Sequence, residues 1–428
     1  MKILFACGGT AGHINPALAI ANKLAENKEN EVLFVGTQKG MEARRIPEGG
    51  FDIKFIEISG LNRKNLFKNL SLPKKIVNSI KQSKQIVKEF QPDFVIGTGG
   101  YVTLPVIYSA HKLGIKTLIH EVNSVAGLAT NLLSKYADII TCAFENTKIK
   151  TSKTIHCTGN PIRPELLRHC ELSKQSSDFN SQPSKRTPQP VGATPHLVEA
   201  DCLRGSASPL SVGRPHFEEP HSTVNYQLST ANCLLRQKLG FDSRPIILAF
   251  GGSLGAEVLN NAIEKLVLEN NDKYQIIWAT GERYFEDIRN RLVEDAALGV
   301  PTSKNSHSSC QLSTANCQLV PYIHNMSELL PIADIVITRA GGVLFEILAL
   351  GKASIIIPSP NVTANHQVKN AENLAKKGAI NMLLEEYIET LPQVIEQTIK
   401  TRKTLETNAL KLAKLHATDE IIKLITSL

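Results

Sequence analysis

His13 follows a glycine-rich loop near the start of the chain, and its imidazole can exchange a proton near neutral pH. An apolar run, residues 3–7, precedes glycines at positions 8, 9 and 12, and an apolar pattern at helical spacing begins near Ala17. A loop that ends a strand and opens a helix presents N–H groups to an anion. The pattern predicts acid–base chemistry beside a bound anion; the alternative is a histidine that only caps the helix.

The same strand-and-glycine pattern recurs at 95–101 and at 246–256. Glycine allows a ligand to approach the main chain without a Cβ in the way. One such loop can exist for packing alone. Three of them predict a binding cleft built from strand ends, where open α/β sheets place their ligands.

Length and composition indicate a two-domain α/β protein. The chain has 428 residues, of which 42% are hydrophobic. No apolar run approaches the roughly 18 residues of a membrane span, and the first strand starts without the features of a secretory signal. We therefore expect a cytosolic location. The eight cysteines include no CxxC pair, which argues against a zinc site.

Residues 61–90 form a basic segment, with eight lysines and arginines against one glutamate. Apolar residues at near-helical spacing lie between the charges, a pattern typical of contact with an anionic membrane surface. An ordinary helix with its apolar stripe on the core is an equal alternative. The segment lacks the interleaved aromatic residues that stack on bases, so we expect no nucleic acid partner.

Alternating strands and helices predict a doubly wound, Rossmann-like sheet in each half of the chain. Strands are expected at 3–7, 31–35, 51–58, 94–96, 116–120, 139–142, 154–158, 246–250, 275–280, 318–321, 335–338 and 354–358. Helices are expected after Ala17 and Pro105 and at 127–136, 257–269, 284–292, 326–332, 343–350 and 367–376. The run Gly159-Asn160-Pro161-Ile162-Arg163-Pro164 breaks the alternation and predicts the inter-domain hinge.

These features divide the chain into a first domain at 1–163, a hinge with an insertion at 164–238, a second domain at 239–403 and a helical segment at 404–428. Residues 169–235 are rich in proline, serine and threonine without an apolar period, so we expect them to be disordered. A second irregular patch at 302–319 repeats the string QLSTANC found at 227–233. We interpret both as insertions at exposed loops.

Seven motifs carry a resemblance that covers nearly the whole chain outside these insertions. They are Gly8-Gly9-Thr10-Ala11-Gly12-His13, Gly97-Thr98-Gly99-Gly100-Tyr101, His120-Glu121-Val122-Asn123, Gly159-Asn160-Pro161-Ile162-Arg163, Gly251-Gly252-Ser253-Leu254-Gly255-Ala256, Arg339-Ala340-Gly341-Gly342 and Asn365-His366-Gln367. Their order resembles that of the MurG family, the peptidoglycan N-acetylglucosaminyltransferases.

The resemblance implies two domains facing a cleft, the B-type glycosyltransferase fold. It implies inverting transfer of N-acetylglucosamine from UDP-N-acetylglucosamine to the C4 hydroxyl of undecaprenyl-diphospho-muramoyl-pentapeptide. No bound metal or other cofactor is implied. The expected location is the cytoplasmic face of the cell membrane, with residues 61–90 on its anionic surface.

The resemblance also assigns residues to roles. His13 or Glu121 is the implied catalytic base, and Tyr101 and His120 lie on the acceptor side. The donor-binding residues it implies are Thr10, Ala11, Gly12, Asn123, Arg163, Ser253, Ile323, Glu346 and Gln367. The chemistry agrees, because a sugar hydroxyl needs a base within hydrogen-bond reach, and loop N–H groups with Arg163 can stabilise charge on the leaving diphosphate.

Some positions depart from the family pattern. The loop from Arg339 to Glu346 is shorter and more apolar than is usual, and Val122 and Leu254 replace frequent glutamines. Two alternatives therefore stay open: a UDP-sugar epimerase or another lipid glycosyltransferase of the same fold, and a catalytically impaired UDP-sugar-binding protein. An NAD enzyme is disfavoured because the loops lack the GxGxxG spacing.

Overall fold

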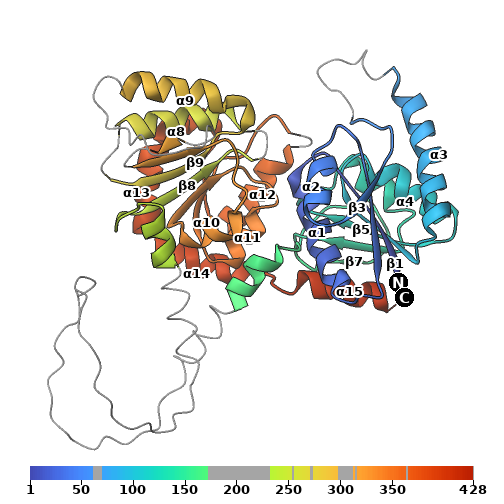
Figure 1. The fold of residues 1–428 in the computed structure, drawn as a ribbon. Helices are drawn as coiled ribbons and strands as arrows, with labels where there is room; N and C mark the ends of the chain where they lie inside the picture. The colour runs from blue at the N-terminus through green and yellow to red at the C-terminus, as the bar shows by residue number, and fades with distance from the viewer. Residues whose placement is uncertain are drawn as a thin grey trace, which may run out of the picture.

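The computed structural model describes residues 1–60, 70–171, 232–252, 255–269, 273–296, 312–313, 316–362 and 365–427. Two α/β domains lie side by side, each with one central sheet between layers of helices (Figure 1). The predicted fold class is confirmed.

The first sheet has the order β3-β2-β1-β4-β5-β6-β7 and is parallel throughout. Its strands are β1 (Lys2–Cys7), β2 (Glu31–Gly36), β3 (Asp52–Phe55), β4 (Phe94–Gly99), β5 (Lys116–Glu121), β6 (Ile139–Cys142) and β7 (Ile155–His156). The central strands are buried on both faces, which is why they read as continuous apolar runs rather than alternating ones.

The second sheet has the order β10-β11-β9-β8-β12-β13-β14, in which only the β10 edge pairs antiparallel among the described strands. Its strands are β8 (Ile246–Phe250), β9 (Gln275–Ala279), β10 (Leu312–Ser313), β11 (Cys317–Val320), β12 (Ile335–Thr338), β13 (Ala353–Ile356) and β14 (Asn381–Met382). In each sheet the order reverses next to the first strand, between β1 and β4 and between β8 and β12. Ligands of open α/β sheets bind beyond the carboxyl ends of the strands at such points.

Helices cover both faces of each sheet (Figure 1). They are α1 (Ala11–Ala25), α2 (Glu42–Glu48), α3 (Leu72–Phe90), α4 (Thr103–Lys112), α5 (Leu128–Leu133), α8 (Glu257–Glu269), α9 (Glu282–Ala296), α10 (Met326–Ile332), α11 (Leu344–Ala349), α12 (His366–Ala375), α13 (Leu391–Lys400), α14 (Arg402–Leu412) and α15 (Ala417–Thr426), with a 3-10 turn at Glu385–Thr390. The prediction that the first helix begins near Ala17 is wrong by about two turns. The sequence pattern groups Gly12 with the loop glycines, but it lies inside the start of α1, as does Pro16.

Helix α3 forms most of the basic segment 61–90, whose residues 61–69 lie outside the described part of the chain. The C-terminal part of its apolar stripe packs on α4: Val87 is buried, Ile86 and Phe90 are partly buried, and Ser109 Oγ donates to Ile80 O at 3.1 Å. The lysines point outward, and Val77 in the first half of the helix is 53% exposed. The C-terminal half of the apolar face is therefore core, while the basic face and Val77 are open to a partner. None of the described helices is long and apolar enough to cross a bilayer.

The chain crosses between the domains at 159–163 and again at 413–416, after α14. Helix α15 returns to pack on α1, with Ile421 and Ile425 buried in the core of the first domain (Figure 1). The predicted hinge is one of the crossings. The predicted boundary at 404 is wrong, because it falls inside α14, which packs on the second domain.

The two predicted insertions differ in outcome. The expected disorder of 169–235 falls largely on 172–231, outside the described residues, and helical residues 164–171 and 232–238 flank that gap. The interpretation of 302–319 as an insertion at an exposed loop is wrong at its end, where the strand predicted at 318–321 begins at Cys317. There β10 and β11 form an antiparallel pair on the edge of the second sheet, with Cys317 buried in β11.

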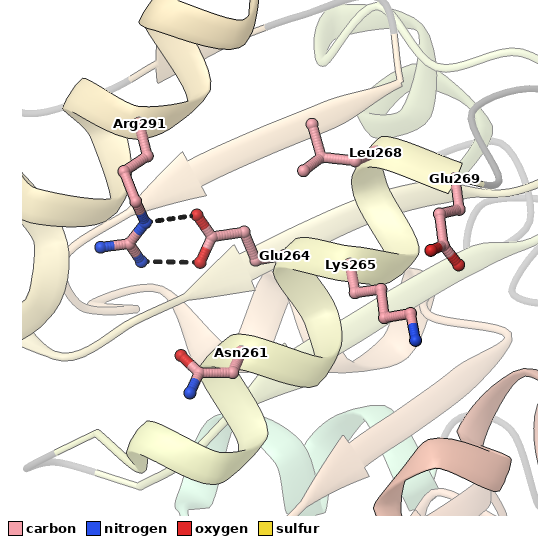
Figure 2. A pocket seen from close by; sticks show the side chains of 6 residues that line it. All are labelled: Asn261, Glu264, Lys265, Leu268, Glu269 and Arg291. Carbon is pink, nitrogen blue, oxygen red and sulfur yellow. Dashed lines mark hydrogen bonds and ion pairs between the residues drawn. The ribbon is translucent and has the colours of Figure 1, made fainter.

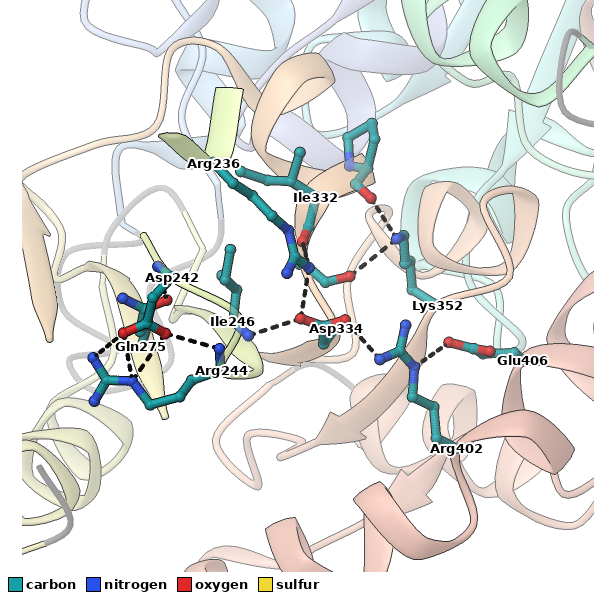
Figure 3. A network of polar contacts seen from close by, with 12 residues as sticks. Arg236, Asp242, Arg244, Ile246, Gln275, Ile332, Asp334, Lys352, Arg402 and Glu406 are labelled. Carbon is teal, nitrogen blue, oxygen red and sulfur yellow. Dashed lines mark hydrogen bonds and ion pairs between the residues drawn. The ribbon is translucent and has the colours of Figure 1, made fainter. Parts of the chain in front are cut away.

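A polar network anchors the helical residues 232–238 to the second domain (Figure 3). Asp334 Oδ2 accepts from Arg236 Nη2 at 2.7 Å and from Ile246 N–H at 2.8 Å, and Asp334 Oδ1 accepts from Arg402 Nη1 at 2.6 Å. Burial opposes ionisation, but the Ile246 N–H and the two guanidinium groups together lower the pKa of Asp334. One carboxylate thus joins the start of β8, the return from the insertion and α14.

We expect Asp334→Asn to lower the free energy of unfolding by about 2 kcal/mol, because the carboxamide turns an N–H₂ group toward one of the guanidinium groups. Urea denaturation at pH 7 measures the change. Asp242→Asn is the control, since Asp242 makes an exposed ion pair with Arg244 in the same network and exposed pairs contribute little. Equal midpoints for the two variants would contradict the anchoring role.

Candidate functional site

The first and second glycine loops touch each other through their backbones. Gly100 has a φ of +86°, and a Cβ there would lie 2.3 Å from Gly8 O. A side chain at this position is excluded by both conformation and space. The predicted approach of strand-end loops is therefore present at the β1–β4 reversal of the first sheet.

His13 lies in the first turn of α1, half-buried beside these loops. Its Nδ1 is 3.1 Å from Gly8 O and 3.4 Å from Thr10 Oγ1. A carbonyl oxygen only accepts, so Nδ1 carries the proton and Nε2 keeps its lone pair. Burial lowers the pKa of His13, while the charge on Glu121 works in the opposite direction. A neutral imidazole with a free Nε2 is the form that a general base requires.

Glu121 ends β5 and is buried, with both carboxylate oxygens engaged. Oε1 accepts from the backbone N–H and the Nδ2 of Asn123, each at 3.0 Å. Oε2 accepts from Gly127 N–H at 3.0 Å and from Thr130 Oγ1 at 2.5 Å. These four hydrogen bonds to protein donors leave the carboxylate little acceptor capacity for a substrate proton. The geometry favours Glu121 as the residue that orients Asn123, and His13 as the base.

His120 and Tyr101 differ in their relation to the site. His120 is buried inside the sheet, where its ring nitrogens lie 2.9 Å from Thr141 Oγ1 and 3.2 Å from Asn160 Oδ1, and burial lowers its pKa to about 4. Both ring nitrogens of His120 are thus engaged with side chains inside the first domain, so among its described contacts none is left for a ligand. The ring of Tyr101 lies against Gly9, in the glycine loop itself.

The two domains meet at this edge of the first sheet through paired polar groups. Asn370 of α12 donates from Nδ2 to Asn123 Oδ1 at 3.2 Å, and its Oδ1 accepts from Ser124 N–H at 2.8 Å. Arg163, in the hinge, has its Nη2 3.3 Å from Glu346 Oε2 in α11. Residues predicted from both halves of the sequence are therefore brought together at one junction.

Glu346 keeps an acceptor position without a hydrogen bond. Its side chain is 4% exposed, and although Arg163 is within ion-pair distance, the two groups are not aligned for a hydrogen bond to Oε2. Burial raises the pKa of Glu346, and the nearby guanidinium opposes that rise. A buried carboxylate oxygen without a donor is costly, and a ligand hydroxyl at the junction would relieve that cost.

The remaining predicted residues occupy different positions around the junction. Gly12 faces the second domain directly, since a Cβ at Gly342 would lie 3.3 Å from Gly12 Cα; Thr10 and Ala11 precede it at the start of α1. Ile323 is buried in the core of the second domain. Gln367 accepts from Ser359 N–H at 2.8 Å. Ser253 lies outside the described residues.

Sequence reasoning missed some residues that the structure places here. Glu42 is a fully buried carboxylate beneath the first glycine loop, and Asn370 bridges the domains. Both lie in stretches that no motif covers. Arg339, by contrast, lies within a motif but is buried against Ile357 O and Glu385, so it holds the second domain together.

Figure 2 shows a hollow on the outer face of α8 and α9, lined by Asn261, Glu264, Lys265, Leu268, Glu269 and Arg291. Arg291 donates from Nε and Nη2 to the two carboxylate oxygens of Glu264, at 2.7 and 2.6 Å. The hollow is open to solvent and lies away from the glycine loops, so we do not assign the site to it. Within the described ranges, no three His, Cys, Asp or Glu side chains gather as a metal site.

Comparison with known proteins identifies related families. The model of the glycosyltransferase family 28 N-terminal domain matches residues 3–141, and that of the family 28 C-terminal domain matches residues 246–425. Relatives named UDP-N-acetylglucosamine--N-acetylmuramyl-(pentapeptide) pyrophosphoryl-undecaprenol N-acetylglucosamine transferase are similar over their whole length. The Lactobacillus johnsonii protein is 33% identical, covering 100% of this chain and 99% of the relative. The Bacillus cytotoxicus protein is 35% identical, covering 99% and 97%.

Solved structures agree on the fold. The crystal structure of Acinetobacter baumannii MurG is 23% identical, with a TM-score of 0.63, and covers 100% of this chain and 99% of that one. A UDP-GlcNAc 2-epimerase from Neisseria meningitidis bound to UDP-GlcNAc is 14% identical, with a TM-score of 0.56 and full coverage of both chains. At these identities the likeness is one of fold alone.

We expect Glu346→Gln to stabilise the protein relative to the wild type, and more so as pH rises. Because the folded-state pKa of Glu346 is raised, the folded wild type holds its proton longer than the unfolded chain and loses stability as pH increases through the interval between the two pKa values. The carboxamide of the variant cannot ionise. Urea denaturation between pH 4 and pH 8 measures the difference, with Glu386→Gln on the exposed 3-10 turn as control. A difference that shrinks with rising pH would contradict the buried, under-bonded carboxylate.

Proposed function

The chain belongs to the UDP-N-acetylglucosamine--N-acetylmuramyl-(pentapeptide) pyrophosphoryl-undecaprenol N-acetylglucosamine transferases of glycosyltransferase family 28, and we propose that it catalyses the reaction of that name. N-acetylglucosamine moves from UDP-N-acetylglucosamine to the C4 hydroxyl of undecaprenyl-diphospho-muramoyl-pentapeptide. The product is lipid II, the precursor of peptidoglycan.

The observation that carries this proposal is the position of His13. It stands on the first domain with a free Nε2, between the glycine loops and the junction with the second domain. Gly12, the residue before it, lies against Gly342 of the second domain, so His13 stands where the two halves of the site meet. This is where a base must stand to remove a proton from an acceptor held by one domain while the donor is held by the other.

The chemistry that follows is a single displacement with inversion. His13 Nε2 accepts the proton of the C4 hydroxyl as that oxygen attacks C1 of the donor sugar, and the bond from C1 to the diphosphate oxygen breaks. Negative charge grows on the leaving UDP. Arg163 and the N–H groups at the start of α1 are the described groups that can stabilise it, so we propose that no bound metal or other cofactor is needed.

Donor binding is proposed to use the residues around the junction. Glu346 supplies an acceptor to the ribose hydroxyls, since its Oε2 has no hydrogen bond. The residues proposed from the first domain are Thr10, Ala11, Gly12 and Asn123. Those proposed from the second are Ile323 and Gln367, and Ser253 is proposed from the sequence resemblance alone. Tyr101 lies on the acceptor side, beside the loop that carries His13. His120 supports the acceptor side from within the sheet rather than by contact.

The activity assay is release of UDP from UDP-N-acetylglucosamine, with and without a lipid-linked muramoyl-pentapeptide analogue. We expect release that depends on the acceptor and falls by about 10²–10⁴-fold in His13→Ala, the usual contribution of a general base. Release without acceptor would favour a hydrolysing enzyme, whereas conversion of the donor to another UDP-sugar without acceptor would favour an epimerase. UDP binding with no release under either condition would favour the impaired binding protein.

Glu121→Gln separates the two candidate bases in the same assay. If His13 is the base, the plot of kcat/KM against pH for this variant still falls on the acid side, but at lower pH. The shift arises because the charge that raises the pKa of His13 is gone. If Glu121 is the base, this fall disappears with the activity. Turnover is expected to fall in either case, since a carboxamide at this position cannot accept all four hydrogen bonds.

The acceptor is lipid-linked, so we also propose that the protein works at the cytoplasmic face of the cell membrane. The outer face of α3 supports this location, because Lys74, Lys75, Lys81, Lys84 and Lys88 are exposed on it. Just before the helix, Leu70 is 80% exposed. A basic surface with an adjoining apolar residue suits an anionic leaflet.

Replacing Lys81, Lys84 and Lys88 with glutamine should weaken binding to vesicles that contain anionic lipid by about a hundredfold, at roughly 1 kcal/mol for each lysine. Vesicle co-sedimentation at low and physiological salt measures this loss. The matched control replaces Lys376, Lys400 and Lys403, which are exposed on the second domain. Equal losses in the two triple variants would indicate general electrostatic attraction and contradict a specific surface on α3.

A further inference from the structure

Glu42, in the first turn of α2, is completely buried under the first glycine loop. Its Oε1 accepts from Thr37 N–H at 3.0 Å and from Thr37 Oγ1 at 2.7 Å. The backbone around Glu42 leaves no space for side chains at three glycines. A Cβ at Gly8, Gly36 or Gly40 would lie within 2.8 Å of the Glu42 side chain. The chain therefore builds a fitted pocket for one carboxylate.

The second carboxylate oxygen of Glu42, Oε2, contacts the first glycine loop. Oε2 accepts from Gly9 N–H at 3.1 Å. That N–H and Gly8 C=O belong to the same peptide group, which is planar and trans, so they point in opposite directions. Gly8 O is the atom that accepts from His13 Nδ1 at 3.1 Å. The Gly8–Gly9 peptide group is therefore hydrogen-bonded at both ends: its N–H donates to Glu42, and its C=O accepts from the imidazole of His13.

We propose that Glu42 is a positioning residue that sets the tautomer of His13 through the Gly8–Gly9 peptide. With Gly9 N–H fixed on the carboxylate, Gly8 O is aimed at Nδ1, Nδ1 must carry the proton, and Nε2 is kept as the basic nitrogen. This inference rests on the proposed role of His13 as base. The tautomer itself can be measured without any activity.

The remaining contacts of His13 do not explain this selection. Thr10 Oγ1, at 3.4 Å from Nδ1, can donate or accept and so permits either tautomer. Thr98 Oγ1 donates to His13 O at 2.7 Å, which fixes the backbone but not the ring. Gly8 O is the described partner of the ring that can only accept.

The test is the tautomer of His13 in protein labelled with ¹⁵N-histidine, read from long-range ¹H–¹⁵N correlations above the pKa of His13. Comparison with His13→Gln assigns the signal. We expect the wild type to show a protonated Nδ1 and a bare Nε2. In Glu42→Gln the amide keeps the volume and can still accept from Thr37, but its N–H₂ group faces Gly9 N–H. We then expect both tautomers or mainly the other one.

Kinetics of the same variant supply the second readout. We expect kcat of Glu42→Gln to fall by about tenfold to a hundredfold, a large part of what a general base contributes, with KM for UDP-N-acetylglucosamine changed less than about threefold. Asp138→Asn is the matched control. Asp138 also accepts a backbone N–H and a threonine hydroxyl, from Thr117 at 2.8 and 3.0 Å, but at the opposite end of the sheet. It should leave the tautomer unchanged.

The outcomes separate this inference from the proposed function. An unchanged tautomer in Glu42→Gln, or a protonated Nε2 in the wild type, overturns the positioning role whatever the rate does. A changed tautomer with unchanged kcat upholds the positioning role and overturns His13 as the base. If Glu42→Gln does not fold, Glu42→Asp takes its place, because its carboxylate can accept from Thr37 yet is one methylene short of Gly9.

Discussion

The site depends on a contact between two backbones, Gly8 and Gly100. With no side chain between them, the loops that end β1 and β4 meet at the reversal of the first sheet. His13 takes its ring position from one of these loops, and the Tyr101 ring lies against Gly9. Because the loops are held by main-chain atoms, the positions of the reactive side chains follow from the sheet itself rather than from flexible surface contacts.

Three buried glutamates near the junction show how hydrogen bonding divides similar side chains among roles. Glu121 holds four donors and Glu42 holds three, so both are committed to the loops they support. Glu346 has an ion-pair partner but an oxygen without a hydrogen bond. A carboxylate whose acceptor positions are taken by protein donors fixes the backbone around it. The one with an empty acceptor position has capacity for a ligand.

Helix α2 connects these roles across the domains. It turns Glu42 inward beneath the glycine loop, while Arg44 lies 3.2 Å from Glu282 and Arg45 contacts Tyr322, both in the second domain. The same short helix therefore touches the peptide that holds His13 and the partner domain. Movement of the domains relative to each other has a direct physical route to that peptide.

The sequence was sufficient for the sheets and the glycine loops, because apolar runs and glycines act locally. It was insufficient for α2, whose seven residues include Pro47 and show too few turns for a helical period. The resemblance assigned roles to Glu121 and His120 from their place in a motif, although burial and hydrogen-bond donors decide what each side chain can do. The pairs Asn123–Asn370 and Arg163–Glu346 depend on how the domains are docked, which no local pattern contains.

The return of α15 to the first domain affects how the protein is made. Residues 164–412 are synthesised between β7 and α15, so the face of α1 that receives Ile421 and Ile425 stays uncovered on the ribosome until the second domain has emerged. Exposed apolar surface in a waiting domain invites aggregation and recruits chaperones. Gly159 packs against Lys414, so the outgoing and returning segments lie side by side. Translation therefore completes the domain that carries His13 after the one that carries Glu346.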